Sequence, residues 1–208
     1  RLEAEGCERF EGCGVYYAAT PVEAPVCRGS VAVVVGGGNS AGQAAVYLAS
    51  IARKVYVVVR GDSLYKSMSS YLAKRIEQTE NIEVLLKTRS RRMLGEESLR
   101  AVEVVNDETG EVRTIQTSAL FSFIGAVPRT DWLPPEIEKD EKGFVKTGIA
   151  VAQSPRWSYG RSPFLLETTR AGVFAAGDVR SGSVKRVASA VGEGAMAVQV
   201  VHEYLRGM

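Results

Sequence analysis

The chain has 208 residues, 45% of them hydrophobic, which is enough to bury one large core or two smaller ones. Its 26 basic and 24 acidic residues leave a net charge of +2, so binding to nucleic acid or to an anionic membrane surface is not expected. We see neither a spanning-length apolar run nor a signal-peptide pattern, and we expect a cytoplasmic protein. Cys7, Cys13 and Cys27 match neither a zinc site nor a CxxC pair, so free thiols and no metal site are expected.

The first part of the chain contains a strand–helix–strand pattern. Residues 1–30 carry glycines and prolines but little periodicity, and we expect them to lead irregularly into the first strand, with 1–13 as a linker. "VAVVV" at 31–35 has the continuous apolar character of a strand buried on both faces of a parallel sheet. A helix at 40–52 and a second strand at 54–59 complete a βαβ unit.

The pattern then changes from parallel to antiparallel. A helix at 67–79 and a strand at 82–86 are followed, over 88–116, by three strand segments separated by turn-forming residues. "ALFSFIG" at 119–125 is typical of a returning buried strand. We therefore predict an α/β fold, with a Rossmann-like three-layer nucleotide-binding domain over 14–127 that combines a parallel sheet with an antiparallel meander.

The remainder of the chain, 128–208, is expected to form a separate part. It is rich in proline, and "GVFAAGD" at 172–178 is a candidate short strand. A final helix is predicted at about 184–206. Its apolar face would comprise Val187, Val191, Met196, Val198, Val201 and Leu205.

A glycine-rich turn connects the first strand to the first helix. Gly36, Gly38 and Ala41 satisfy GxGxxG/A, in which the glycines allow a tight turn and a close approach of backbone N–H groups to a pyrophosphate. The helix N-terminus adds partial positive charge. This context predicts dinucleotide binding.

The end of the second strand indicates which dinucleotide binds. An acidic residue there would favour NAD, whereas a cation favours the 2′-phosphate of NADP. "VYVVVRGD" ends with Arg60, and Lys66 and Arg75 follow, so NADPH is favoured. The alternative is that these three are solvated surface cations.

Four stretches together resemble the thioredoxin reductase family of flavoprotein pyridine-nucleotide reductases. They are "GVYYAATP" (14–21), "VAVVVGGGNSAGQAAVYL" (31–48), "FSFIGAVPRT" (121–130) and "GVFAAGDVRSGSVKRVASAVGEGAMAV" (172–198). The resemblance implies that residues 128–208 are the C-terminal part of an FAD-binding domain. It also implies that Asp178 accepts from the ribityl chain of FAD and that backbone groups of Arg186, Val187 and Ala188 meet the flavin ring.

The residues expected to contact NADPH or FAD come from both parts of the chain. They are Gly36, Gly37, Gly38, Asn39, Ser40, Ala41, Arg60, Lys66, Arg75, Ile124, Gly125, Gly177, Asp178, Arg186, Val187 and Ala188. A helix N-terminus directed at the flavin would stabilise the negative charge of the reduced ring.

The chain departs from the family pattern at the redox centre. The two cysteines of the family's CxxC correspond to Ala18 and Pro21, and the acidic residue that follows corresponds to Val22. Alanine and proline cannot form a disulfide or a thiolate, so no catalytic residue is assigned. The electron acceptor is therefore expected to be reached without a dithiol relay; a quinone, ferredoxin, dioxygen or an unidentified protein all remain open.

The basic cluster after the second strand is also reduced. The family presents a histidine and two adjacent arginines, then a third, whereas this chain has Val59, Arg60, Gly61 and Tyr65. Candidates to compensate are Lys66, Ser67, Ser69 and Arg75. An NADH-using enzyme thus remains an alternative.

The family's N-terminal motif for the ADP half of FAD is missing, and the chain starts at Arg1 without methionine. We expect a C-terminal fragment of a longer polypeptide, or a chain that pairs with the missing FAD-domain half in trans. The resemblance implies a homodimer and hydride transfer from NADPH to FAD. The alternatives are a catalytically inactive nucleotide-binding regulatory module and a ferredoxin- or quinone-type NAD(P)H reductase.

Overall fold

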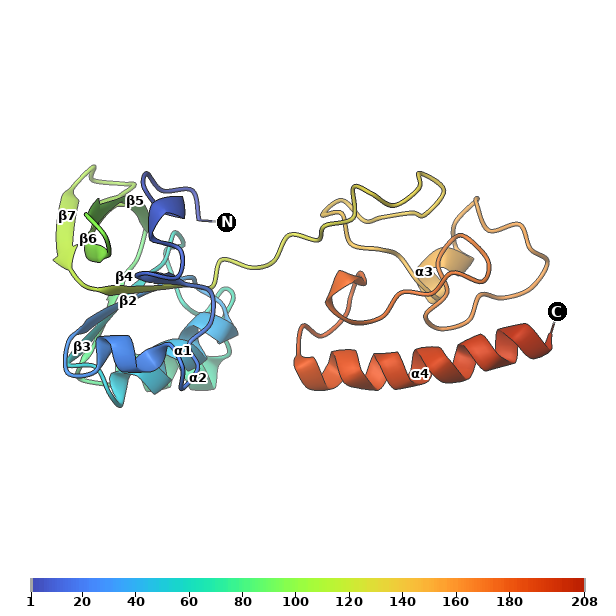
Figure 1. Cartoon of the computed structure of the whole chain (residues 1–208), viewed down its shortest axis with the longest axis horizontal. Helices are drawn as coiled ribbons and strands as arrows, with labels where there is room; N and C mark the ends of the chain where they lie inside the picture. Colours follow the sequence, from blue (N-terminus) through green and yellow to red (C-terminus); the bar gives the residue numbers. More distant parts are fainter. Residues whose placement is uncertain (1, 208) are drawn as a thin grey trace. The chain divides into compact units, whose positions relative to one another are not determined.

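The structure is a computed structural model that describes residues 2–207. The chain forms two compact units, one ending at Gly125 and the other beginning at Ala126. The first unit is an α/β sandwich, and the second consists of irregular chain packed against one long helix (Figure 1). Within the described residues no helix is long and apolar enough to cross a membrane.

A five-stranded parallel sheet forms the middle layer of the first unit. In spatial order its strands are β1 (Val15–Tyr16), β8 (Ala119–Ser122), β2 (Val31–Val35), β3 (Lys54–Val58) and β4 (Ile82–Leu85). Every neighbouring pair runs parallel. The predicted strands at 31–35, 54–59, 82–86 and 119–125 are confirmed, with ends shifted by up to three residues.

Two helices cover one face of this sheet (Figure 1). They are α1 (Asn39–Ala49) and α2 (Ser70–Glu77). The helices approach closely at Gly42, where an added Cβ would lie 2.6 Å from Leu72 Cδ2. Helix α2 begins three residues later than predicted, because Ser67 and Ser69 hydrogen-bond to the glycine turn instead.

An antiparallel sheet covers the other face of the parallel sheet (Figure 1). Its strands are β5 (Thr88–Gly95), β6 (Leu99–Asn106) and β7 (Val112–Gln116), as the predicted meander required. Thus the predicted α/β class with a parallel sheet and an antiparallel meander is confirmed.

The segment before β2 contributes to the packing of this unit. It holds the short 3₁₀ helices η1 (Glu8–Phe10) and η2 (Ala24–Cys27). Cys7 and Phe10, within the expected linker 1–13, are 3% and 1% exposed in the core between the two sheets. Two isolated apolar residues without a repeat give no periodic signal, which is why the sequence does not predict this packing.

The second unit has less regular structure. Its elements are α3 (Ile149–Ala152), the 3₁₀ helix η3 (Gly177–Val179) and α4 (Val187–Arg206). The strand predicted at 172–178 is wrong, because the segment makes a single bridge, between Glu167 and Phe174, and then turns into η3. One bridge does not form a ladder.

A buried carboxylate holds the irregular part of this unit together. Glu167 is 0% exposed and accepts two hydrogen bonds from the Arg161 guanidinium, at 2.6 and 2.8 Å. It also accepts the backbone N–H groups of Phe164 and Gly172, both at 2.9 Å. The Arg161 guanidinium lies over aromatic rings that include that of Tyr204 in α4. The carboxylate therefore links distant segments to the long helix.

Helix α4 is confirmed, but its predicted apolar face does not lie in the core of this unit. Val187 is 83% exposed, Val191 67% and Val198 61%. The buried residue of the helix is Glu193, at 8% exposed. Periodicity identifies the side chains that share a face of a helix, but it does not say what covers that face.

Candidate dinucleotide and flavin sites

The glycine turn lies at the switch point of the parallel sheet. After β2 the chain continues to β3 on one side, while β8 lies on the other side of β2. The carboxyl ends of β2 and β8 meet, since Val35 lies opposite Ser122 and its carbonyl accepts the Phe123 N–H at 2.7 Å. Such a switch point is where open α/β sheets bind ligands. Ile124 and Gly125, which follow directly, are exposed beside the turn.

The first glycine of the turn is required by the fold itself. Gly36 has a φ of +142°, and an added Cβ would lie 2.5 Å from the Phe123 carbonyl oxygen. It would also lie 3.2 Å from the Cβ of Ala41, which is fully buried at the start of α1. The small residues at these two positions therefore let helix, strand and turn pack closely.

The third glycine faces open space instead. Gly38 has ordinary extended backbone angles, and an added Cβ would have Ser67 O as its nearest neighbour, at 3.9 Å. It is the N-cap of α1, and within residues 2–207 no side chain caps the first backbone N–H groups of Asn39, Ser40 and Ala41. A turn with room at this glycine and uncapped amides behind it fits a pyrophosphate.

The loop after β3 is hydrogen-bonded to the turn. Ser67 Oγ donates to the carbonyl of Gly37 at 2.8 Å, and the Ser69 N–H donates to Asn39 Oδ1 at 2.8 Å. Arg60 lies at the start of the same loop, two residues after the end of β3. These bonds fix the loop's position relative to the turn.

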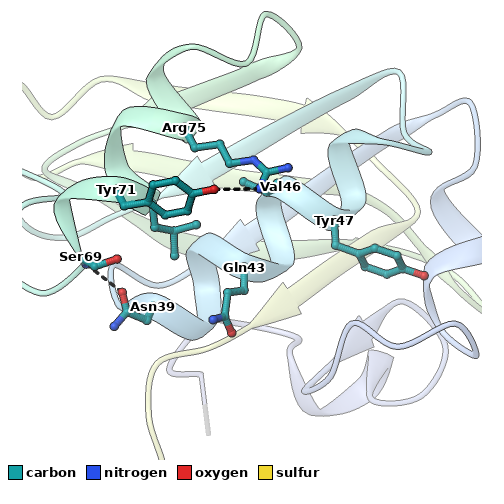
Figure 2. Close-up of a pocket in the computed structure, with 8 residues that line it drawn as sticks. Asn39, Gln43, Val46, Tyr47, Ser69, Tyr71 and Arg75 are labelled. Carbon is teal, nitrogen blue, oxygen red and sulfur yellow. Dashed lines mark hydrogen bonds between the residues drawn. The ribbon is translucent and has the colours of Figure 1, made fainter.

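A pocket of about 420 Å³ lies between α1 and α2 and starts at the turn residue Asn39 (Figure 2). Gln43 and Tyr47 line it from α1, and Tyr71 and Arg75 line it from α2. Arg75 Nη1 lies 3.5 Å from the Tyr71 hydroxyl. Arg75 thus lines the same pocket as Asn39, but its guanidinium lies beside Tyr71 and Val46, toward the middle of α1 (Figure 2).

The three candidate cations for the 2′-phosphate differ in availability. Lys66 forms an ion pair with Asp62 at 2.7 Å, and the hydrogen bond from Lys66 lowers the pKa of Asp62. Arg60 is exposed in the loop that follows β3 and has no acidic partner within the described part of the chain. Arg75 has the Tyr71 hydroxyl as its partner, at 3.5 Å, and likewise no ion pair within the described residues. Arg60 and Arg75, unlike Lys66, can therefore turn to a phosphate without first breaking an ion pair.

A capping box occupies the position of the dithiol turn. Thr20 donates its backbone N–H, at 3.0 Å, and its hydroxyl to the carboxylate of Glu23, and Thr20 Oγ1 accepts the Val22 N–H at 3.2 Å. The hydrogen bonds from Thr20 lower the pKa of Glu23. Ala18 and Pro21 lie in and beside this turn. The T-x-x-E pattern of residues 20–23 is the sequence signal for this turn.

The three cysteines are not paired with one another within the described residues. All three are free thiols in the described structure. Burial raises the pKa of Cys7 and of Cys27, which disfavours the reactive thiolate.

The predicted flavin residues lie together in the second unit. Gly177 is buried with a φ of +76°, and an added Cβ would lie 3.2 Å from the Cβ of Ala190 in α4. Asp178 follows with its side chain exposed, and its backbone carbonyl accepts from Lys185 Nζ at 2.7 Å. The turn thus presents a carboxylate to solvent just before the start of α4.

The N-terminus of α4 is exposed and is not capped by the side chain of its N-cap residue. Arg186 is the N-cap without a side-chain hydrogen bond to the helix, and Val187 and Ala188 are exposed. Free backbone amides at a helix N-terminus beside an exposed carboxylate fit the electron-rich edge and the ribityl hydroxyls of a flavin.

The order of these features along the chain matches a known family. Residues 17–194 match the model of the pyridine nucleotide-disulphide oxidoreductases, which is most of the chain. The chain belongs to this family. Members of its thioredoxin reductase branch use FAD and NADPH.

Individual members of the family show the same relationship. Thioredoxin reductase of Yarrowia lipolytica is 35% identical over 174 residues, 83% of this chain and 50% of the relative. The enzyme of Schizosaccharomyces pombe is 33% identical over 99% of this chain and 59% of its own length. The crystal structure of Lactococcus lactis thioredoxin reductase superposes with a TM-score of 0.81 at 26% identity, covering all of this chain and 63% of that one. The chain therefore spans about half to three fifths of the curated relatives it matches.

Proposed function

We propose that this chain provides the NADPH site and part of the FAD site of a flavoprotein oxidoreductase that transfers a hydride from NADPH to FAD. The observation that carries the proposal is the pair of open helix N-termini, each beside a glycine-containing turn, at α1 and α4. When bound, the nicotinamide supplies a hydride that the flavin accepts.

In the first unit, the uncapped amides behind Gly38 would bind the pyrophosphate of NADPH. Ile124 and Gly125, beside the turn, would border the nicotinamide half of the cofactor. Arg60 would bind the 2′-phosphate, with Arg75 as a second cation and Lys66 engaged by Asp62. A charge-assisted contact from arginine to phosphate is stronger than a neutral hydrogen bond, so NADPH is preferred to NADH.

In the second unit, Asp178 would accept from the ribityl chain, and the start of α4 would stabilise the reduced ring. The exposed apolar stripe of α4 that includes Val187, Val191 and Val198 supports packing against further residues of an FAD-binding domain, in cis or in trans. A homodimer and small-molecule dinucleotides as ligands belong to the same proposal.

We further propose that electrons leave the flavin without a dithiol. The Thr20–Glu23 capping box replaces the relay turn, and the two buried thiols do not favour the thiolate. The same replacement favours the second candidate function, a nucleotide-binding module without turnover. The acceptor of the enzyme would be a quinone, ferredoxin, dioxygen or a protein other than thioredoxin.

The first prediction separates these two functions. With FAD bound, anaerobic addition of NADPH is expected to bleach the visible absorbance band of the oxidised flavin, because hydride transfer reduces the ring. Stopped-flow absorbance measures it. NADPH binding without bleaching would identify a regulatory module and would contradict the reductase.

The second prediction concerns Arg60. Arg60→Ala is expected to lower the preference for NADPH over NADH by about tenfold to a hundredfold, since it removes a charge-assisted bond of ~1.5–3 kcal/mol. The matched control is Arg53→Ala, because Arg53 is an exposed arginine just before the opposite end of β3. Dissociation constants for both nucleotides measure the preference. An unchanged ratio in Arg60→Ala would assign the 2′-phosphate to another residue, with Arg75→Ala as the next variant.

A further inference from the structure

Helix α4 contains one charged side chain that is buried where its neighbours are exposed. Glu193 is 8% exposed, while Val191, two residues earlier, is 67% exposed. A buried carboxylate is costly unless hydrogen bonds and an opposite charge compensate it. The contacts of Glu193 therefore indicate what this burial achieves.

Both carboxylate oxygens of Glu193 bind the turn that precedes the helix. Oε2 accepts the Gly177 N–H at 2.7 Å and Arg180 Nε at 3.0 Å. Oε1 accepts Arg180 Nη2. The remaining guanidinium nitrogen, Nη1, donates to Thr147 Oγ1 at 3.1 Å. The hydrogen bond from Arg180 lowers the pKa of Glu193, so the carboxylate is charged at neutral pH.

These contacts fix η3 at both ends. Gly177 and Arg180 flank Asp178, one residue before it and two residues after it, and both bind the same carboxylate. The left-handed backbone of Gly177 packs against Ala190 of α4. Within the described structure the hydrogen bonds of Glu193 go to Gly177 and Arg180 and none goes to Asp178, which is exposed.

We infer that Glu193 and Arg180 are positioning residues that hold the Asp178 carboxylate in register with the N-terminus of α4. This inference rests on the proposed flavin role of Asp178. The ion pair would fix the distance between the carboxylate and the helix amides before the cofactor arrives. This preorganisation would raise the affinity for FAD, because FAD would bind the Asp178 carboxylate and the α4 amides at the same time.

A role limited to folding would have a different signature. If Glu193 acts on FAD through Asp178, its effect on FAD affinity disappears once Asp178 cannot accept the ribityl bond. If Glu193 only stabilises the fold, its effect on affinity is the same in either background. A double-mutant cycle measures this difference directly.

The experiment uses Glu193→Gln, Asp178→Asn and the double variant, with Glu203→Gln, an exposed acid on the same helix, as the matched control. FAD dissociation constants come from titration of the flavin-free protein by flavin fluorescence. We expect Glu193→Gln to weaken binding by about tenfold alone and by less than about twofold in the Asp178→Asn background. Equal factors in both backgrounds would overturn the inference.

Two further measurements keep the outcome clear. Amide hydrogen exchange at Gly177, measured without flavin, is expected to accelerate in Glu193→Gln and not in Glu203→Gln. Unchanged exchange would contradict the positioning role of Glu193. If Glu193→Gln does not fold, Arg180→Lys replaces it in the cycle, because lysine keeps the positive charge but lacks the forked pair of donors. Its effect on FAD affinity is likewise expected to disappear in the Asp178→Asn background. If the unsubstituted protein binds no FAD, the proposed function fails, and with it the role of Glu193 and Arg180 in FAD binding. The exchange measurement still decides whether Glu193 holds the turn at Gly177.

Discussion

Glu167→Gln is expected to lower the free energy of unfolding of the second unit by about 3 kcal/mol, because it leaves the Arg161 charge without its partner. Glu167 is 0% exposed and accepts four hydrogen bonds, two from Arg161 and one each from Phe164 and Gly172. The value lies at the low end of the range for a broken buried pair, since the Arg161 side chain is 35% exposed and can turn toward water.

The chain offers a selective readout for this variant. Its two tryptophans, Trp132 and Trp157, both lie in the second unit, so tryptophan fluorescence during denaturant unfolding reports that unit. The control is Glu136→Gln, whose partner Arg170 is 54% exposed; it should change stability by less than about 1 kcal/mol. Equal losses of unfolding free energy in the two variants would show that the buried Glu167–Arg161 pair stabilises the unit no more than the exposed Glu136–Arg170 pair does.

The Glu167 carboxylate also makes the folding stability of the second unit depend on pH in the acid range. Burial raises the pKa of Glu167, but the hydrogen bonds from Arg161, Gly172 and Phe164 outweigh it and hold the pKa below its ordinary value. A depressed folded pKa contributes stability above the unfolded pKa, and that stability is lost as the pH falls through the folded pKa. Glu167→Gln should therefore flatten the fall in stability below about pH 4.5.

The βαβ core of the first unit could be predicted from sequence because each of its elements carries its own local signal. Continuous apolar runs mark β2 and β3, and the glycines mark the turn between β2 and α1. The antiparallel strands are equally well bounded by turn residues. Local chemistry and tertiary packing agree in these segments, so pattern and structure coincide.

The features that sequence missed depend on contacts between distant residues. Phe10 is buried by an irregular segment that packs against the antiparallel sheet. Glu193 lies in a helix whose hydrophobic pattern assigns burial to the opposite side chains, and its partner Arg180 lies on a turn. Such partners become visible only when the chain has folded. The candidate site shares this limit: the glycines were identifiable from spacing, whereas the hydrogen bonds of Ser67 and Ser69 to Gly37 and Asn39, 30 residues away, were not.

Alanine substitutions at Gly36 and Gly38, the two outer glycines of the turn, are expected to have different effects: one on folding stability and the other on NADPH binding. Gly36→Ala should disrupt the turn in the absence of any ligand, because its φ of +142° is unfavourable for alanine and the Cβ would lie 2.5 Å from Phe123 O. A loss of at least about 2 kcal/mol is expected for strain of this kind. Faster amide hydrogen exchange at the carboxyl ends of β2 and β8 would report it.

Gly38→Ala should instead leave the free protein intact and weaken NADPH. Its backbone angles suit alanine, and the nearest atom to the added Cβ is 3.9 Å away, so folding stability should stay the same or rise by up to about 1 kcal/mol. The methyl group would occupy the space through which a pyrophosphate approaches the α1 amides, and NADPH affinity is expected to fall by about tenfold or more. Titration with NADPH, followed by nicotinamide fluorescence, measures the loss. Native affinity in Gly38→Ala would mean that the nucleotide does not bind at this turn, because the open space at Gly38 would then have no occupant.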